Sequence, residues 1–338
     1  REEVDVVHCH NPNGGVLGRL AAALSKRKPY VIYTAHGFHF FQGAPLKSWL
    51  FYYPVEKFLA RFSDVIITIN HEDYRRAEKF RYKKQGKAEL IPGVGVDLQL
   101  FTPMGNNQGD NEKRDILRRA WGIPEHAFHI VSAGELNDNK NQKVVIEAIA
   151  KLKNKNIYYS ICGEGNKRKE LENEIVRCGL SEQVFLRGYR NDMAEVWKTA
   201  DLSVFPSIRE GMGMAGLEAM ACAVPLIVAD NRGTREYMID RENGWVCNAD
   251  SANEFAEAIT FLYENPSERQ RLAQRAISTV KKFSLQQTEK RMRQIYENLP
   301  VADQSIVESS ESLPMISVIM GVYNQQDIDA FEKSVQSV

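Results

Sequence analysis

The chain has 338 residues, of which 43% are hydrophobic and 26% charged, and its 44 acidic residues balance its 44 basic residues. This is the composition of a globular protein of about two domains, and its balanced charge argues against nucleic acid as a partner. The five cysteines are scattered without metal-ligand or disulfide spacing, so we expect reduced thiols and a cytoplasmic protein with no bound metal.

The first part of the chain, residues 1–103, alternates strands and helices. Strands are predicted at 4–9, 30–36, 64–70 and 88–92, and helices at 14–29, 45–63 and 71–82. This alternation is typical of a parallel sheet with helices on its faces. The chain starts with Arg1 and enters a strand almost at once, so we expect this domain to be incomplete and the chain to be a piece of a longer protein. Residues 104–113 are polar and rich in Gly and Asn, which predicts a linker.

Residues 114–298 repeat the pattern and predict a second doubly wound domain. Strands are predicted at 129–136, 157–165, 183–189, 202–207 and just after Pro225, and helices at 141–153, 167–180, 193–200, 253–266 and 284–298. Ligands of such sheets bind at the carboxyl ends of the strands. Two domains of this kind predict a cleft between them, and residues 299–314 read as a second linker.

The segment "SIREGMGMAGLEAMACAVPLIV", residues 207–228, places two glutamates around a flexible turn and a helix start. A helix that begins near Gly213 or Met214 points unpaired amides and its positive dipole end at an anion such as phosphate. Glu218 lies on that helix and leans back toward its start, where a carboxylate suits the two hydroxyls of a ribose. Glu210 lies before the helix and can accept from a sugar. The arrangement predicts a site for a nucleotide-sugar.

The same residues also have plainer interpretations. Glu218 could be an exposed helix residue, Lys140 a solvated loop lysine, and His36 the cap of a strand-to-helix turn. We expect His8, His10 and His39 to be structural. The aromatic runs "FHFF" and "WLFYY" are typical of a core or an interface, and the alternative is a surface that rests on a membrane.

The motif "EGMGMAGLE" resembles the glutamate–seven residues–glutamate motif of retaining GT-B glycosyltransferases of sequence family 4. "ELIPGVGVDLQLF" is similar to the interdomain strand of that family, and "TAHGFHF" to its N-domain histidine segment. The resemblance covers residues 1 to about 298. It implies the GT-B fold, in which two Rossmann-like α/β domains face a cleft.

The resemblance also implies roles for individual residues. Glu210 and His36 would be catalytic. The donor would be bound by Lys140, Gly188, Arg190, Gly213, Met214, Ala215 and Glu218. No metal or other cofactor is implied. One position departs from the family, since many members carry Arg where this chain has Glu135, and this puts one contact to the diphosphate in doubt.

We therefore expect a retaining hexosyltransferase that moves a sugar from a nucleotide diphosphate donor, expected to be a UDP-sugar, to an acceptor hydroxyl. The acceptor would be a sugar or a lipid-linked sugar in cell-surface polysaccharide or glycolipid synthesis, and the membrane-associated alternative places the protein on the cytoplasmic face. Two rival functions are a nucleotide-sugar 2-epimerase of GT-B-like fold and a nucleotide-sugar-binding subunit without catalysis.

Residues 315–338 form a separate segment after the second linker. The stretch "ISVIMGVYN" resembles the first strand of family 2 glycosyltransferases of the GT-A fold, which would make this segment the start of a further domain. The alternative is a stray strand added to the sheet. With only 24 residues (315–338) the segment is too short to form a core, so we expect the first two domains not to depend on it.

Overall fold

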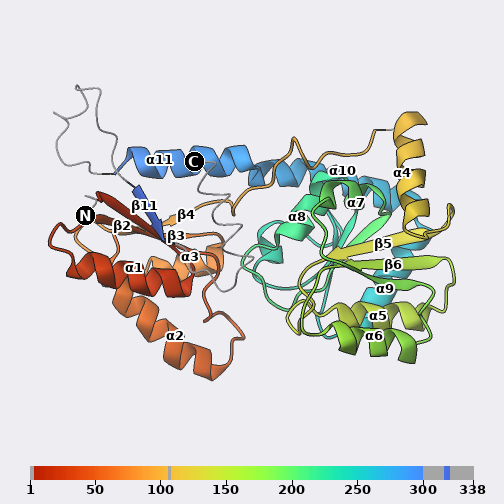
Figure 1. Ribbon diagram of the computed structural model, residues 1–338, viewed down its shortest axis with the longest axis horizontal. Helices are drawn as coiled ribbons and strands as arrows, with labels where there is room; N and C mark the ends of the chain where they lie inside the picture. Colours follow the sequence, from red (N-terminus) through yellow and green to blue (C-terminus); the bar gives the residue numbers. More distant parts are fainter. Residues whose placement is uncertain (1–3, 106–107, 300–315, 320–338) are drawn as a thin grey trace. The chain divides into compact units, whose positions relative to one another are not determined.

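The computed structural model describes residues 4–105, 108–299 and 316–319, which form two α/β units (Figure 1). The first unit comprises residues 1–93 and 290–338, and the second comprises residues 94–289. Each unit is built on one sheet in which all paired strands are parallel. The predicted fold class, two Rossmann-like sheets covered by helices, is confirmed.

The first unit has a five-stranded sheet in the order β11-β1-β2-β3-β4. Its strands are β1 Val6–His10, β2 Tyr30–Ala35, β3 Val65–Thr68, β4 Lys87–Leu90 and β11 Ile316–Ile319. Its helices are α1 Pro12–Leu24, α2 Leu46–Leu59, α3 His71–Ala77 and the short 3-10 helix η1 Ala60–Phe62. The central strands are almost wholly buried because helices cover both faces of a parallel sheet, and this explains their continuous apolar sequence.

The segment 315–338 contributes an edge strand to this sheet. Strand β11 pairs in parallel with β1, with Val6 opposite Ile316 and Cys9 opposite Ile319. This agrees with the alternative interpretation, an added strand. The family 2 GT-A interpretation finds no support in these four residues, and the rest of the segment lies outside the described residues.

A buried ion pair links the two helices that cover one face of the first sheet. Arg19 of α1 and Glu56 of α2 lie 2.8 Å apart, and the Arg19 side chain is fully buried. The guanidinium also stacks on the Tyr33 ring, 4.0 Å from its centroid, and the Tyr33 hydroxyl donates to Glu56 at 3.2 Å. Buried charges are tolerated when they are paired in this way, so this group fixes α1 and α2 against β2.

The second unit has a six-stranded sheet in the order β10-β9-β8-β5-β6-β7. Its strands are β5 Phe128–Ala133, β6 Ile157–Cys162, β7 Val184–Gly188, β8 Leu202–Phe205, β9 Leu226–Ala229 and β10 Trp245–Cys247. Its helices are α4 Gln108–Ala120, α5 Gln142–Leu152, α6 Arg168–Arg177, α7 Met193–Lys198, α8 Met214–Ala221, α9 Ala252–Glu264 and α10 Pro266–Val280, with the 3-10 helices η2 Thr234–Glu236 and η3 Lys281–Phe283. Strands β5 and β8 are neighbours at its centre although 68 residues separate their ends, and this crossover brings their following loops together.

Several boundaries differ from the sequence predictions. The linker predicted at 104–113 overlaps α4, which begins at Gln108 and is held by ion pairs from Arg114 and Arg118 to Asp201. The division between the units falls after residue 93, and a second one falls within α11 Leu285–Glu297. Helix α10 and strand β10 were not predicted. None of the helices in the described part of the chain combines the length and apolar character needed to cross a bilayer.

Candidate functional site

An ion pair between Lys140 and Glu210 lies at the carboxyl end of the second sheet. The Lys140 ammonium is 2.5 Å from Glu210 Oε1, and the two side chains are 23% and 14% exposed. Lys140 follows β5 and Glu210 follows β8, so the pair depends on the adjacency of these strands. The ammonium also lies 5.3 Å from the centre of the Phe205 ring. Two residues predicted separately from the sequence therefore meet in one place.

Hydrogen bonds join the loop after β5 to the loop after β8. The Ile208 amide donates to the Asn139 carbonyl at 2.8 Å, and the Asn139 side chain donates to the Arg209 carbonyl at 2.9 Å. Asn141 adopts a left-handed conformation just before α5, with φ of 54°, and its side chain donates to the Ala249 carbonyl at 2.8 Å. These bonds fix the backbone on both sides of Lys140 and Glu210, so their side chains start from defined positions.

Helix α8 begins at Met214, as the sequence predicts, and Gly213 shapes its start. Gly213 has φ of 91°, and a Cβ atom built on it would lie 2.7 Å from the Phe205 ring. Only glycine adopts this conformation and fits this space without strain. The first amides of the helix, from Met214 and Ala215, have no partner within the helix and carry the positive end of its dipole. The helix start is therefore suited to an anion.

Glu218 lies one turn further along α8 and is partly buried. Burial raises the pKa of its carboxyl group above the usual value, and the nearby indole N–H of Trp197 opposes part of this rise. In the described part of the chain no Lys or Arg forms an ion pair with Glu218. A desolvated carboxylate without a cationic partner gains from hydrogen-bond donors, so Glu218 is suited to bind hydroxyl groups.

Three glycine turns lie side by side at the ends of β5, β6 and β7. The Gly163 amide donates to the Gly188 carbonyl at 2.8 Å, and a Cβ on Gly163 would lie 2.0 Å from the Gly134 carbonyl oxygen. A Cβ on Gly134 would meet the Lys140 side chain at 3.2 Å. The turns therefore connect Gly188, a predicted donor residue, to the Lys140 pair through direct backbone packing.

Arg190, another predicted donor residue, is already engaged in the structure. Its guanidinium forms a two-pronged pair with Asp192 and lies 5.4 Å from the centre of the Trp121 ring. The neighbouring Tyr189 is 79% exposed and follows Gly188 directly, and the sequence prediction did not single it out. The sequence gives no signal for this exposure, because large aromatic side chains are usually buried.

His36 lies in the first unit, after β2, within a group of three histidines. His36 Nε2 is 3.1 Å from His10 Nδ1, and the His8 and His10 rings are tilted against one another with centroids 4.2 Å apart. His8 is buried and hydrogen-bonds Thr34 at 2.7 Å and Tyr296 at 2.6 Å. The pairing of His10 with His36 was not predicted, since the sequence indicates only that His8 and His10 share one face of a strand.

The histidines of this group are neutral near pH 7. Burial lowers the pKa of His10 to about 4 and of His8 to about 3, and repulsion among the imidazoles adds to both shifts. Desolvation also lowers the pKa of His36, although its side chain is exposed. Each neutral ring carries one N–H, and only one proton can lie between His10 Nδ1 and His36 Nε2, so the tautomer of one ring fixes that of the other.

No metal site is evident in the residues that the structure describes. Across residues 4–105, 108–299 and 316–319, no three His, Cys, Asp or Glu side chains are grouped so as to hold a metal ion. Metal independence stays a prediction.

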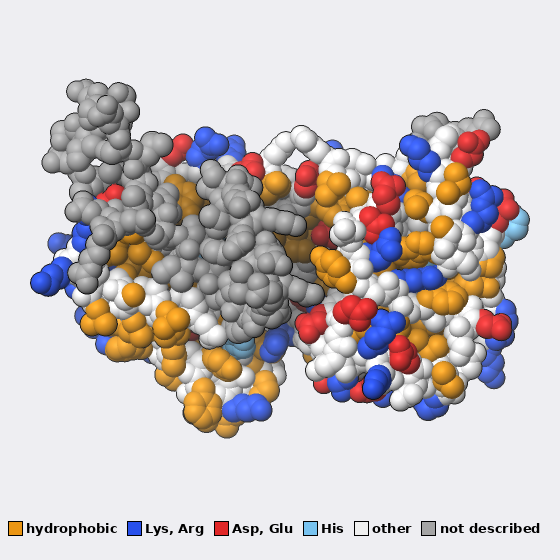
Figure 2. Space-filling view, viewed as in Figure 1, with side chains coloured by type: hydrophobic (Ala, Val, Ile, Leu, Met, Phe, Trp, Pro, Cys, Tyr) orange, Lys and Arg blue, Asp and Glu red, His pale blue; other side chains and the backbone are white. Residues whose placement is uncertain are grey.

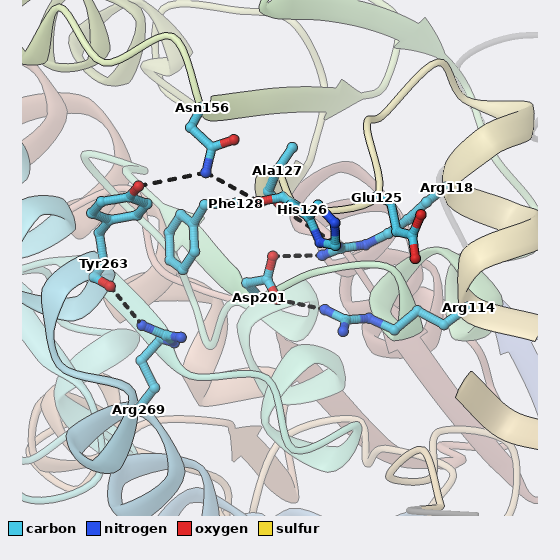
Figure 3. Close-up of a pocket in the computed structure, with 10 residues that line it drawn as sticks. All are labelled: Arg114, Arg118, Glu125, His126, Ala127, Phe128, Asn156, Asp201, Tyr263 and Arg269. Carbon is cyan, nitrogen blue, oxygen red and sulfur yellow. Dashed lines mark hydrogen bonds and ion pairs between the residues drawn. The ribbon is translucent and has the colours of Figure 1, made fainter. Parts of the chain in front are cut away.

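A cavity of about 460 Å³ lies at the opposite end of the second sheet from the Lys140 pair (Figure 3). It is lined where β5, β6 and β8 begin, by Phe128, Asn156 and Asp201 among others. Asp201 accepts from Arg114, Arg118 and the His129 amide. Burial raises the pKa of Asp201, but these cations and the amide outweigh burial and hold the pKa below its usual value. The group anchors α4, and the predicted site residues lie elsewhere.

Comparison with known families matches both parts of the chain. The family described as "Glycosyl transferases group 1" matches residues 113–279, and the family described as "Glycosyltransferase Family 4" matches residues 1–100. The two matches therefore fall on the two units in turn.

The chain is also similar to individual named proteins. The chain is 43% identical over 297 residues to EpsD of Bacillus subtilis, which its name assigns provisionally to the glycosyltransferases, covering 87% of this chain and 76% of that protein. It is 30% identical over 264 residues to an Escherichia coli enzyme named UDP-Gal:alpha-D-GlcNAc-diphosphoundecaprenol alpha-1,3-galactosyltransferase, covering 77% of this chain and 66% of that enzyme.

Solved structures share the fold. Anabaena Alr3699/HepE in complex with UDP matches with a TM-score of 0.75 at 20% identity, covering 87% of this chain and 79% of that one. Sucrose-phosphate synthase of Thermosynechococcus elongatus matches with a TM-score of 0.72 at 21% identity, covering 90% and 74%. These likenesses identify the architecture as GT-B.

The start of α8 should be intolerant of any side chain at Gly213. Gly213→Ala is expected to destabilise the protein by about 1–2 kcal/mol from the left-handed backbone and by about 1–3 kcal/mol more from the clash with Phe205. Gly179→Ala is the matched control, because Gly179 has φ of 67° and open space around a new Cβ. Urea denaturation of both variants measures the difference. Equal losses would show that the helix start can shift, which would contradict a fixed anion site.

Proposed function

Since the chain belongs to the group 1 glycosyltransferases of GT-B fold, we propose that it transfers a sugar from a UDP-sugar to an acceptor hydroxyl with retention at the anomeric carbon. The observation that carries this proposal is the Lys140–Glu210 ion pair beside the start of α8. A cation, a helix start and two carboxylates in one place match the phosphates, ribose and sugar of such a donor.

Lys140 is proposed to bind the diphosphate while it remains close to Glu210. An ammonium has three donors, and Glu210 uses one of them. The remaining donors and the α8 amides of Met214 and Ala215 neutralise the negative charge that grows on the departing phosphate. This supplies the electrostatic stabilisation that a metal ion supplies in other transferases, and it does so with groups fixed in advance. We therefore propose that the reaction needs no divalent metal.

The proposed bond changes take place on one face of the sugar. The bond from the anomeric carbon to the diphosphate oxygen breaks, and the acceptor oxygen forms its bond on the same side. The acceptor proton passes to the departing diphosphate. Glu210 accepts from sugar hydroxyls as the ring gains positive charge, and His36, held by His10, is the proposed catalytic group from the first unit.

The named relatives support the donor and the acceptor of this proposal. HepE is solved with UDP and with UDP-glucose, and the Escherichia coli relative is named for a UDP-galactose donor and a lipid diphosphate-linked acceptor. We propose by analogy a UDP-sugar donor and a lipid-linked sugar acceptor for this chain. The hexose itself is left to experiment.

Substitution of the two glutamates of the site should affect different kinetic constants. Glu218→Ala leaves ribose hydroxyls unpaired in ground and transition states alike, at a cost of about 1–3 kcal/mol, so it should raise the donor KM. Glu210→Ala removes a carboxylate from the sugar as it becomes positive, so it should lower kcat more than it raises KM. Steady-state release of UDP from a panel of UDP-sugars, with a lipid-linked acceptor and with EDTA present, measures both.

Controls for this experiment use the Gln variants, which keep the shape of each side chain and remove its charge. Wild-type kinetics for both Ala variants would remove the site from consideration, and loss of turnover in EDTA would exclude metal independence. Release of a free epimer without acceptor would favour the epimerase, and UDP-sugar binding without turnover would favour a binding subunit.

The exposed face of α2 is proposed to rest on the membrane that carries the acceptor. Leu46, Leu50, Phe51 and Phe58 are 74%, 64%, 71% and 51% exposed, and apolar side chains gather over α1 and α2 (Figure 2). The helix also carries Lys47 and Lys57. Large apolar side chains with interspersed lysines are typical of helices that lie in the interface of an anionic membrane.

Binding to vesicles tests this surface. We expect the chain to co-sediment with vesicles of phosphatidylcholine and phosphatidylglycerol, more weakly with phosphatidylcholine alone, and to lose most binding in Leu50→Ser/Phe51→Ser. The control is Val176→Ser/Ile239→Ser, which removes two aliphatic side chains that are 69% and 57% exposed in the second unit. A wild-type chain that stays in the supernatant, or equal loss in both variants, would contradict the proposal.

A further inference from the structure

Trp197 of α7 is buried beneath α8, and its indole N–H lacks a hydrogen bond of good geometry within the described part of the chain. The residue is 1% exposed and packs in a hydrophobic cluster with Val131, Cys162 and Ala219. Its Nε1 has no hydrogen-bond partner of good geometry among the described residues. Burying a donor in this condition disfavours folding.

Glu218 is the acceptor that this N–H faces. The nearby indole N–H opposes the rise that burial causes in the pKa of the Glu218 carboxyl group. The indole N–H therefore lies near the carboxylate without forming a hydrogen bond of good geometry with it. Helices α7 and α8 pack together, which places the two side chains on neighbouring elements.

We propose that Trp197 is a positioning residue for the ribose of the donor: its indole N–H holds one oxygen of Glu218 so that the carboxylate presents its remaining lone pairs to the two ribose hydroxyls. This inference rests on the proposed function, because it assigns a nucleotide to the site. A carboxylate has about four lone-pair positions, so one can serve the indole and others the ribose.

The orientation matters because the two ribose hydroxyls are fixed relative to one another. A carboxylate that rotates freely meets both hydroxyls in only part of its orientations, and ordering it on binding costs entropy. An oxygen held by Trp197 removes that rotation before the nucleotide arrives. The expected result is a site that favours ribose over deoxyribose, since only ribose uses both contacts.

The test compares the affinity of UDP with that of 2′-deoxy-UDP by calorimetry in the wild-type chain and in Trp197→Phe. In the wild type, loss of one hydroxyl from a charged acceptor should weaken binding about tenfold. Trp197→Phe should weaken the binding of UDP about tenfold and the binding of 2′-deoxy-UDP much less, so that the ratio of the two affinities falls toward one. If Trp197 has a purely structural role, the variant should weaken the binding of both ligands equally and leave the ratio of their affinities unchanged.

Two further variants separate the possible failures. Trp245→Phe removes another buried tryptophan of the same unit and should leave the ratio at its wild-type value. Replacing Trp197 with β-(3-benzothienyl)alanine keeps the ring shape and removes the N–H, so it serves if the Phe variant does not fold. If the wild type does not bind UDP, the proposed function fails. If Glu218→Gln abolishes the preference for ribose while neither Trp197 variant changes it, the role of Trp197 alone is overturned.

Discussion

The ion pair of Lys140 and Glu210 exists because β5 and β8 are neighbours in the second sheet although they are distant in the sequence. Parallel strands end at the same edge, so the loop after each strand brings one charged side chain to a shared place. The bond between Asn139 and Arg209 joins the loops at their backbones. A lysine that already contacts a carboxylate is not desolvated alone, and it still has donors for a phosphate.

Close backbone approach is the second constraint on this site. The turns that contain Gly134 and Gly163 touch at distances that leave no space for a side chain, and Gly213 begins α8 in a conformation that glycine adopts most readily. Backbone amides and a lysine can therefore surround a phosphate that bulkier residues would exclude. In the first unit, the three histidines around β1 and β2 are also held by close contacts, since their neutral rings orient one another without a charged partner.

Both sheets and the start of α8 could be predicted from the sequence. The features that were missed depend on contacts between residues that are distant in the sequence. The alternation of apolar strands and helices predicted both sheets, and the segment from Glu210 to Glu218 predicted the helix start at Met214 because local glycines and periodicity determine it. Helix α4 was missed because its polar sequence is stabilised by distant ion pairs to Asp201. The pairing of His10 with His36 depends on the register of two strands, and sequence spacing does not specify that register. The roles of the site residues stay predictions, since geometry places them and only chemistry tests them.

The central claim is that Lys140 recognises the diphosphate of the donor rather than serving only as a partner of Glu210. The most direct measurement is the affinity of wild-type protein and of Lys140→Gln for UDP and for uridine, by isothermal titration calorimetry. We expect Lys140→Gln to weaken the binding of UDP by about tenfold or more and to leave the binding of uridine unchanged. The reason is that a hydrogen bond to a charged group is lost only where phosphate is present. Unchanged UDP binding, or an equal loss for both ligands, would contradict it.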